Sequence, residues 1–225
     1  MKMIRLAAAF LLTALLLGRF AATGMQHPGG SGEFDHFQSF REARLNLPEK
    51  QGSPCSVEPG ELPPLYAYRL AQTVRFDLDG DGTPETFTLR EGRLTVEAAP
   101  GIIWESPQDW WVEYFFLGDA NNNGSPELNL IVWKEGSFGP QKPFWVEEEE
   151  PGVKNHFFVF KLEKGAIKPV WQSSSLDRPN YRAALVDHHG DGQNELMALE
   201  GCYNDPSLQN VTLWTWNGWG FSRID

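Results

Sequence analysis

The sequence DLDGDGTPE at residues 77–85 returns as DANNNGSPE at 119–127 and as DHHGDGQNE at 187–195. Each copy begins with Asp, has Asp or Asn at its fifth position, Gly at its sixth and Glu at its ninth. Short oxygen-bearing side chains at alternate positions, with Gly where the chain turns sharply, can wrap around a hard cation such as calcium. Three copies in the same register indicate a repeat protein whose structural unit carries this loop.

The chain around these three loops consists of short apolar or alternating runs separated by turn residues, which is typical of an all-β protein. The sequence predicts three units of four antiparallel strands, with the loop between the first and second strand of each unit. The predicted strands are 70–76, 86–90, 93–98 and 101–104, then 112–118, 127–133, 156–162 and 166–171, and finally 181–187, 195–201, 210–216 and 220–224. A four-stranded antiparallel unit repeated along a chain is a propeller blade, so a propeller-like array of about three blades is expected.

The second unit carries an insertion at 136–155, between its second and third strands. Successive turns of an antiparallel unit alternate between its two ends, so the insertion and the segment 104–111 are expected at the end opposite the loops. Exposed aromatic rings beside acids suit a glycan or a basic protein segment, and we therefore predict a partner site there. Its candidate contact residues are Trp110, Trp111, Phe144 and Trp145. The alternative is that most of these rings belong to the core.

The first 24 residues have the pattern of a signal peptide. Basic residues precede an apolar run that is short for a membrane span, and Ala22 and Gly24 suit cleavage after residue 24. We therefore expect export, to the cell envelope or outside the cell, without membrane insertion of the mature chain; an uncleaved anchor is the alternative. Residues 25–65 have the composition of a linker, with a possible short helix at 34–47.

The net charge of −11 becomes more negative still without residues 1–24, which contain basic residues and no acidic ones. Such a surface repels nucleic acid and anionic membranes and favours cations or basic partners. The chain has two cysteines, Cys55 and Cys202. In an exported protein such a pair predicts one disulfide, which would tie the segment before the first unit to the last unit; two unrelated thiols are the alternative.

With a loop of this kind between the first two strands of each unit, residues 66–225 resemble the FG-GAP and VCBS repeats of integrin-alpha-type β-propellers. The metal loop of that family has the form D-x-[DN]-x-[DN]-G-x-x-[DE]; the first two copies satisfy it and His189 breaks it in the third. The resemblance implies calcium as the bound ion. The implied ligand positions are Asp77, Asp79, Asp81, Thr83 and Glu85 in the first loop, Asp119, Asn121, Asn123, Ser125 and Glu127 in the second, and Asp187, His189, Asp191, Gln193 and Glu195 in the third.

The three loops differ in charge, and we expect the first, with four carboxylates, to bind calcium most tightly. The third has an imidazole where an oxygen is expected and is interpreted as degenerate, with a transition metal at His188 and His189 as the alternative. Each loop could also be an acidic turn held by its own Asx hydrogen bonds. An EF-hand is excluded because its twelfth position needs an acid, and Thr88, Leu130 and Ala198 stand there.

The sequence has no nucleophile-elbow, zinc-protease or phosphate-loop motif. The expected function is therefore a binding or adhesion module for a glycan or a protein. A carbohydrate-active hydrolase with paired carboxylates and an accessory role in a larger envelope assembly are the alternatives. The sequence leaves open whether the array is a closed ring, an open arc or an oligomer.

Overall fold

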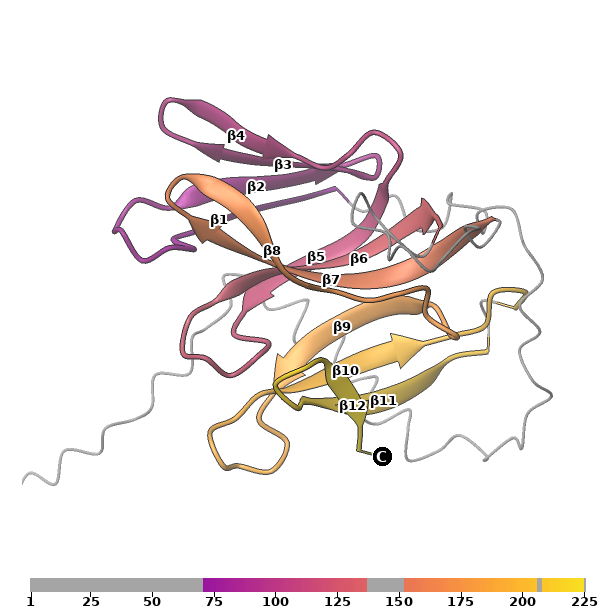
Figure 1. Cartoon of the computed structure of the whole chain (residues 1–225). Helices are drawn as coiled ribbons and strands as arrows, with labels where there is room; N and C mark the ends of the chain where they lie inside the picture. The colour runs from indigo at the N-terminus through magenta and orange to yellow at the C-terminus, as the bar shows by residue number, and fades with distance from the viewer. Residues whose placement is uncertain (1–70, 137–151, 206–207, 225) are drawn as a thin grey trace, which may run out of the picture.

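The computed structural model describes residues 71–136, 152–205 and 208–224, and over these ranges the chain forms twelve β-strands and no helix (Figure 1). The first sheet contains β1 (Gln72–Phe76), β2 (Glu85–Arg90), β3 (Arg93–Ala98) and β4 (Gly101–Glu105). The second contains β5 (Trp111–Gly118), β6 (Glu127–Glu135), β7 (Val153–Glu163) and β8 (Ala166–Gln172). The third contains β9 (Asn180–Val186), β10 (Glu195–Glu200), β11 (Asn210–Trp216) and β12 (Phe221–Arg223).

Each sheet is antiparallel with its strands in chain order, so the three predicted four-stranded units are confirmed. The observed strand ends differ from the predicted ones by only a few residues. Alternating apolar residues bounded by Gly-containing turns therefore sufficed to locate the strands. The possible helix at 34–47, the signal segment and most of the insertion lie outside the described residues.

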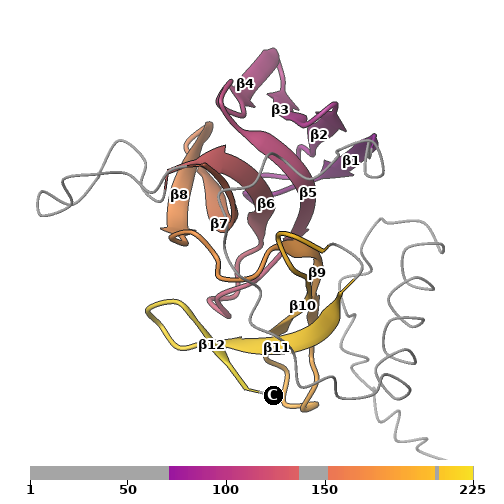
Figure 2. The ribbon, with the colours of Figure 1, turned by 90° about the vertical axis from the view of Figure 1, so that its right-hand side faces the viewer.

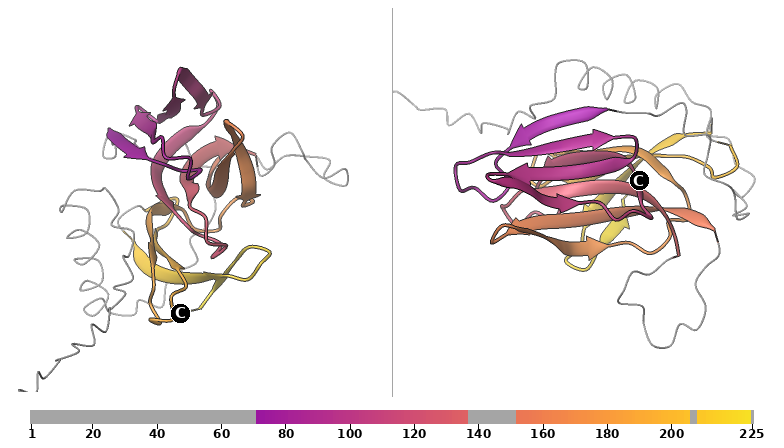
Figure 3. Two further views of the ribbon diagram at one scale, coloured as in Figure 1. Left: turned by 90° about the vertical axis from the view of Figure 1, so that its left-hand side faces the viewer. Right: turned by 90° about the horizontal axis from the view of Figure 1, so that it is seen from above.

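The three sheets are stacked in chain order, with the second sheet in the middle (Figures 1 and 3). The first strands β1, β5 and β9 lie along one side of the stack and the last strands β4, β8 and β12 along the other (Figure 2). The three candidate metal loops lie at one end, where β1, β5 and β9 finish. The link from β4 to β5 lies at the other end, as do the end of β6 and the start of β7, which confirms the expected alternation of turns.

Two hydrophobic cores hold the sheets together, one on each face of the second sheet. Leu128 and Leu130 of β6 belong to the core between the first and second sheets, which also contains Phe87 of β2. Ile131 of the same strand belongs to the core between the second and third sheets, which also contains Leu196 of β10. Both faces of β6 are therefore buried, and full burial of each such side chain stabilises the fold by about 1.5–3 kcal/mol.

The outer faces of the first and third sheets differ in polarity. The first sheet presents polar side chains outward, and the burial of its strands alternates accordingly. The third sheet presents apolar side chains there, Met197, Leu199, Val211 and Leu213, which are only 3–8% exposed. Among the described residues, strands pack against only the opposite face of this sheet.

Cys202, two residues beyond β10, takes part in a disulfide. Cys55, the only other cysteine of the sequence, lies outside the described residues, so the predicted pairing stays a prediction. In the described ranges there is no helix with the length and apolar character needed to cross a membrane.

Candidate functional site

The three loops share one backbone arrangement, fixed by their first and last residues. Both carboxylate oxygens of the first Asp accept backbone N–H groups from within the loop. One of these bonds goes to the sixth-position Gly in every loop, at 2.8, 2.7 and 3.0 Å in the pairs Asp77–Gly82, Asp119–Gly124 and Asp187–Gly192. These are the Asx-type bonds expected of an acidic turn.

The ninth-position Glu is the buried anchor of each loop. Glu85, Glu127 and Glu195 are 3%, 1% and 4% exposed. In each, Oε2 accepts the backbone N–H of the second loop residue, at 2.9, 2.8 and 2.8 Å from Leu78, Ala120 and His188. The other oxygen, Oε1, is thereby left for the centre of the loop. This explains why Glu recurs directly before an apolar strand, which turn chemistry alone did not explain.

The centre of the first loop is formed by carboxylates alone. Asp77, Asp79 and Glu85 each place an oxygen within 4.8 Å of the others, and among the described residues this is the only such group. Burial raises the pKa of Glu85, and the nearby charges of Asp79 and Asp77 raise it further. Asp81 instead accepts the N–H of Thr83 at 2.7 Å. Converging acids, of which Glu85 is buried and Asp79 is exposed, are the donor set that a hard cation takes.

In the second loop, side-chain amides occupy the corresponding centre. Asn121 and Asn123 donate through Nδ2 to Oε1 of Glu127, at 2.7 and 3.0 Å. Burial raises the pKa of Glu127 to about 7, and the charge of Asp119 adds to the rise. Near neutral pH this loop therefore carries less negative charge than the first, in line with the weaker binding expected for it.

In the third loop an imidazole occupies the centre. Nδ1 of His189 lies 3.0 Å from Oε1 of Glu195, and this hydrogen bond raises the pKa of His189. A protonated His189 brings a positive charge of its own to the place where the first loop gathers oxygens. The ring of His188 lies edge-on to it, with centroids 5.1 Å apart. The interpretation of the third loop as a degenerate site stays a prediction.

The second and third loops are joined by a clasp that sequence reasoning missed. Oδ1 of Asn122 accepts the backbone N–H of Asn194 at 2.7 Å, and its Nδ2 donates to the Asn194 carbonyl at 3.0 Å. Nδ2 of Asn194 in turn donates to the carbonyl of Asp119 at 2.9 Å. Asn122 has φ of 59°, in the left-handed region that Gly80 and Gly190 adopt at the same loop position.

The signal for this clasp was present in the sequence. The fourth loop position is Gly, Asn and Gly, and the eighth is Pro, Pro and Asn. The two residues that depart from the repeat are the two that contact each other.

The predicted partner residues pack within the fold as far as they are described. The Trp110 ring lies 4.9 Å from that of Phe158 at the edge of the first core. Trp111 is half-buried and covers Gly92, where a Cβ would come within 2.3 Å of its ring. Phe144 and Trp145 lie outside the described residues. Partner binding at this end stays a prediction.

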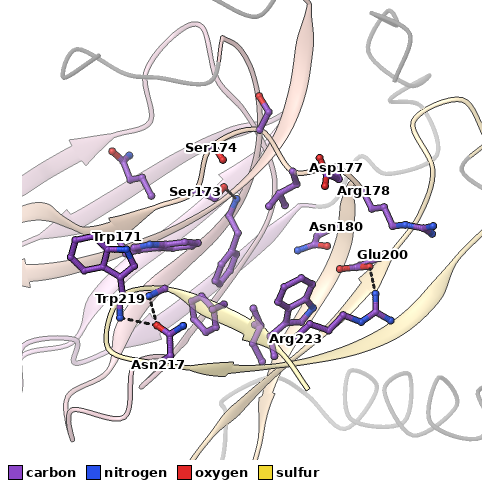
Figure 4. Close-up of a pocket in the computed structure, with 18 residues that line it drawn as sticks. Trp171, Ser173, Ser174, Asp177, Arg178, Asn180, Glu200, Asn217, Trp219 and Arg223 are labelled. Atoms are coloured by element: carbon purple, nitrogen blue, oxygen red, sulfur yellow. Dashed lines mark hydrogen bonds and ion pairs between the residues drawn. The ribbon is translucent and has the colours of Figure 1, made fainter. Parts of the chain in front are cut away.

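A cleft of about 700 Å³ lies between β8 of the second sheet and the β11–β12 hairpin of the third (Figure 4). Its walls combine aromatic rings with charged groups. They include Trp171, Trp219, Asp177, Arg178, Glu200 and Arg223. The sequence analysis did not predict this cleft. The one signal was Trp219, an aromatic residue in a hairpin turn where small or polar residues are usual.

No family model matches this chain, and neither a curated protein nor a solved structure matches it significantly. The resemblance of the loops to FG-GAP and VCBS repeats therefore stays an expectation based on their residues and their place between strands.

Proposed function

We propose that this chain is an exported, propeller-like binding module whose blades are stabilised by cations in the loops, with calcium in the first loop. The observation that carries the proposal is the group of Asp77, Asp79 and Glu85, whose oxygens lie within 4.8 Å of one another around a buried carboxylate. Like charges at this spacing repel, and a divalent cation between them converts the repulsion into attraction.

The stacking of three four-stranded sheets supports the propeller-like part of this proposal. Blades of a propeller place their first strands around the axis and their last strands outside, and the first and last strands here lie on opposite sides of the stack (Figure 2). The first-to-second-strand loops then form one rim of the array. A cation in such a loop acts on stability, because it binds the folded chain and not the unfolded one.

Thermal unfolding with calcium and with a chelator tests the proposal. Calcium at about 100 times its Kd adds about 2.7 kcal/mol to the free energy of unfolding, which raises the melting temperature by several degrees. Asp79→Ala should remove most of this gain. Asp109→Ala is the matched control, because Asp109 is an exposed acid in the β4–β5 link away from the loops. Identical wild-type curves with calcium and chelator would reduce the loops to ordinary turns.

A carbohydrate-active hydrolase is the second candidate, and one observation favours it. Two carboxylates, from Asp177 and Glu200, line the same cleft, as the paired acids of a glycosidase do (Figure 4). Release of reducing ends from oligosaccharides, lost in both Asp177→Asn and Glu200→Gln, would support it. Absence of release by the wild-type protein leaves the binding module.

A further inference from the structure

We infer that the cleft between the second and third sheets binds an uncharged oligosaccharide, with Trp219 as the exposed platform on which a sugar ring stacks. The inference rests on the proposed function only in that the chain is a binding module, and it does not require any loop to bind calcium. The site differs from the described part of the partner site predicted from the sequence, because neither Trp110 nor Trp111 lines it.

The aromatic wall of the cleft is pre-formed. The Trp171 ring packs edge-on against the rings of Trp216 and Phe221, with centroids 6.1 and 5.4 Å apart. Phe221 in turn packs against Phe157 of the second core at 5.5 Å. Gly220 permits this approach, since a Cβ there would come within 3.2 Å of Nε1 of Trp171. A wall already ordered in the free protein loses little conformational entropy when a ligand binds.

Trp219 is the side chain that the fold itself does not use. It is 89% exposed, the highest value among the large hydrophobic residues of the described ranges. Oδ1 of Asn217 accepts the backbone N–H groups of Trp219 and Gly220, at 2.9 and 3.0 Å, so the turn that carries the indole is fixed. The corresponding β3–β4 and β7–β8 turns have no aromatic residue, so the hairpin does not need one.

The charges of the cleft point to an uncharged ligand. Arg178 and Arg223 are balanced by Asp177 and Glu200, and Arg223 lies 3.8 Å from Glu200. This local balance contrasts with the net charge of −11 of the whole chain, which would favour a cationic ligand elsewhere on the surface. Guanidinium donors beside carboxylate acceptors match neighbouring hydroxyl groups, each of which both donates and accepts.

An oligosaccharide combines the two features that the cleft offers. The C–H face of a pyranose is flat and weakly polar and stacks on an indole, while its hydroxyl groups meet the charged side chains at the rim. The volume of about 700 Å³ falls within the range of small-molecule sites in proteins, which fits a short oligosaccharide segment. Trp219 and Arg178 are exposed and ready to contact it (Figure 4).

The test uses the full mature chain and a panel of four neutral tetrasaccharides, built from β-linked glucose, α-linked glucose, mannose and N-acetylglucosamine. Binding is measured by titration calorimetry and by the change in tryptophan fluorescence. We expect at least one neutral tetrasaccharide to bind, and we expect Trp219→Ala to weaken it by about tenfold or more without changing the melting temperature. Ile102→Ala is the control, because Ile102 is 57% exposed on β4 of the first sheet, outside the cleft.

Three outcomes would overturn the inference: no binding of any neutral tetrasaccharide, binding unchanged in Trp219→Ala, or tighter binding of tetragalacturonate or tetralysine. Arg178→Gln adds a second probe and should weaken the neutral sugar several-fold. A calcium effect on melting with no sugar binding would overturn this inference and leave the cation proposal standing. Sugar binding that persists in a chelator, together with calcium-independent melting, would support this inference and overturn the cation proposal.

Discussion

The first and third loops have the same backbone and different centres. In both, the first Asp accepts the N–H of the sixth-position Gly and the buried Glu accepts that of the second residue. The first loop then gathers carboxylate oxygens, whereas the third places His189 against Glu195. The comparison separates two functions of one motif: Asp, Gly and Glu at positions 1, 6 and 9 form the turn, and the residue at position 3 decides what its centre can hold.

The buried Glu should therefore matter for stability in the third loop whether or not an ion binds. Glu195→Ala leaves the N–H of His188 and the ring of His189 without their shared acceptor, and we expect a loss of about 2–3 kcal/mol in the free energy of unfolding. Urea unfolding in a chelator measures it. Asp191→Ala, an exposed position of the same loop, should cost less than half as much. Equal losses would show that Glu195 is not the anchor.

Replacing the imidazole should convert the third centre into one like the first. We expect His189→Asp to lower the melting temperature in a chelator, because Asp and Glu195 then repel, and to raise the calcium-dependent gain above that of the wild type. At about 30 times the Kd of the new site the added gain would be about 2 kcal/mol. Calorimetric titration counts the ions bound. An unchanged calcium response would show that position 3 does not decide the centre.

The clasp distinguishes the second and third loops from the first, and a double-mutant cycle can measure it. Asn122→Gly and Asn194→Pro each install the residue that the other two loops carry. If the two side chains act through each other, the double variant should be no worse than the poorer single variant, with a coupling free energy of about 1 kcal/mol. Strictly additive losses in urea unfolding would show that the clasp contributes nothing as a pair.

The smallest expected effect is the pH dependence of stability that His189 contributes to the third loop, and its direction is defined. Because Glu195 raises the pKa of His189 in the folded chain, protonation stabilises that state. The contribution is complete below pH 6.5, the ordinary value for His, and is lost as the pH rises through the raised value. In a chelator, the wild type should therefore exceed His189→Gln in melting temperature at pH 5.5 and lose this excess in mildly alkaline buffer. A constant difference would exclude the charge as its source.

The sequence was sufficient for what depends on neighbours along the chain. Alternation located the strands, and the spacing of Asp, Gly and Glu located the loops and predicted the acids that converge in the first one. It was insufficient where contacts cross from sheet to sheet. Trp171 and Trp219 face one cleft because β8 and the β11–β12 hairpin come from different sheets. The partial burial of Trp110 likewise depends on its packing against Phe158, a contact that only the fold supplies.

The unlike outer faces of the first and third sheets give the array a direction. Thr86, Thr88 and Thr95 let the first sheet end in water, so nothing need be added beyond it. Met197 and Leu213 on the outer face of the third sheet are apolar and only 8% and 3% exposed, and an apolar face of this kind associates with another molecule when it is exposed to water. The two ends of the array therefore differ in what they can bind: variants in which the outer face of the third sheet becomes exposed should associate through that face, whereas the first sheet should stay monomeric at its own outer face.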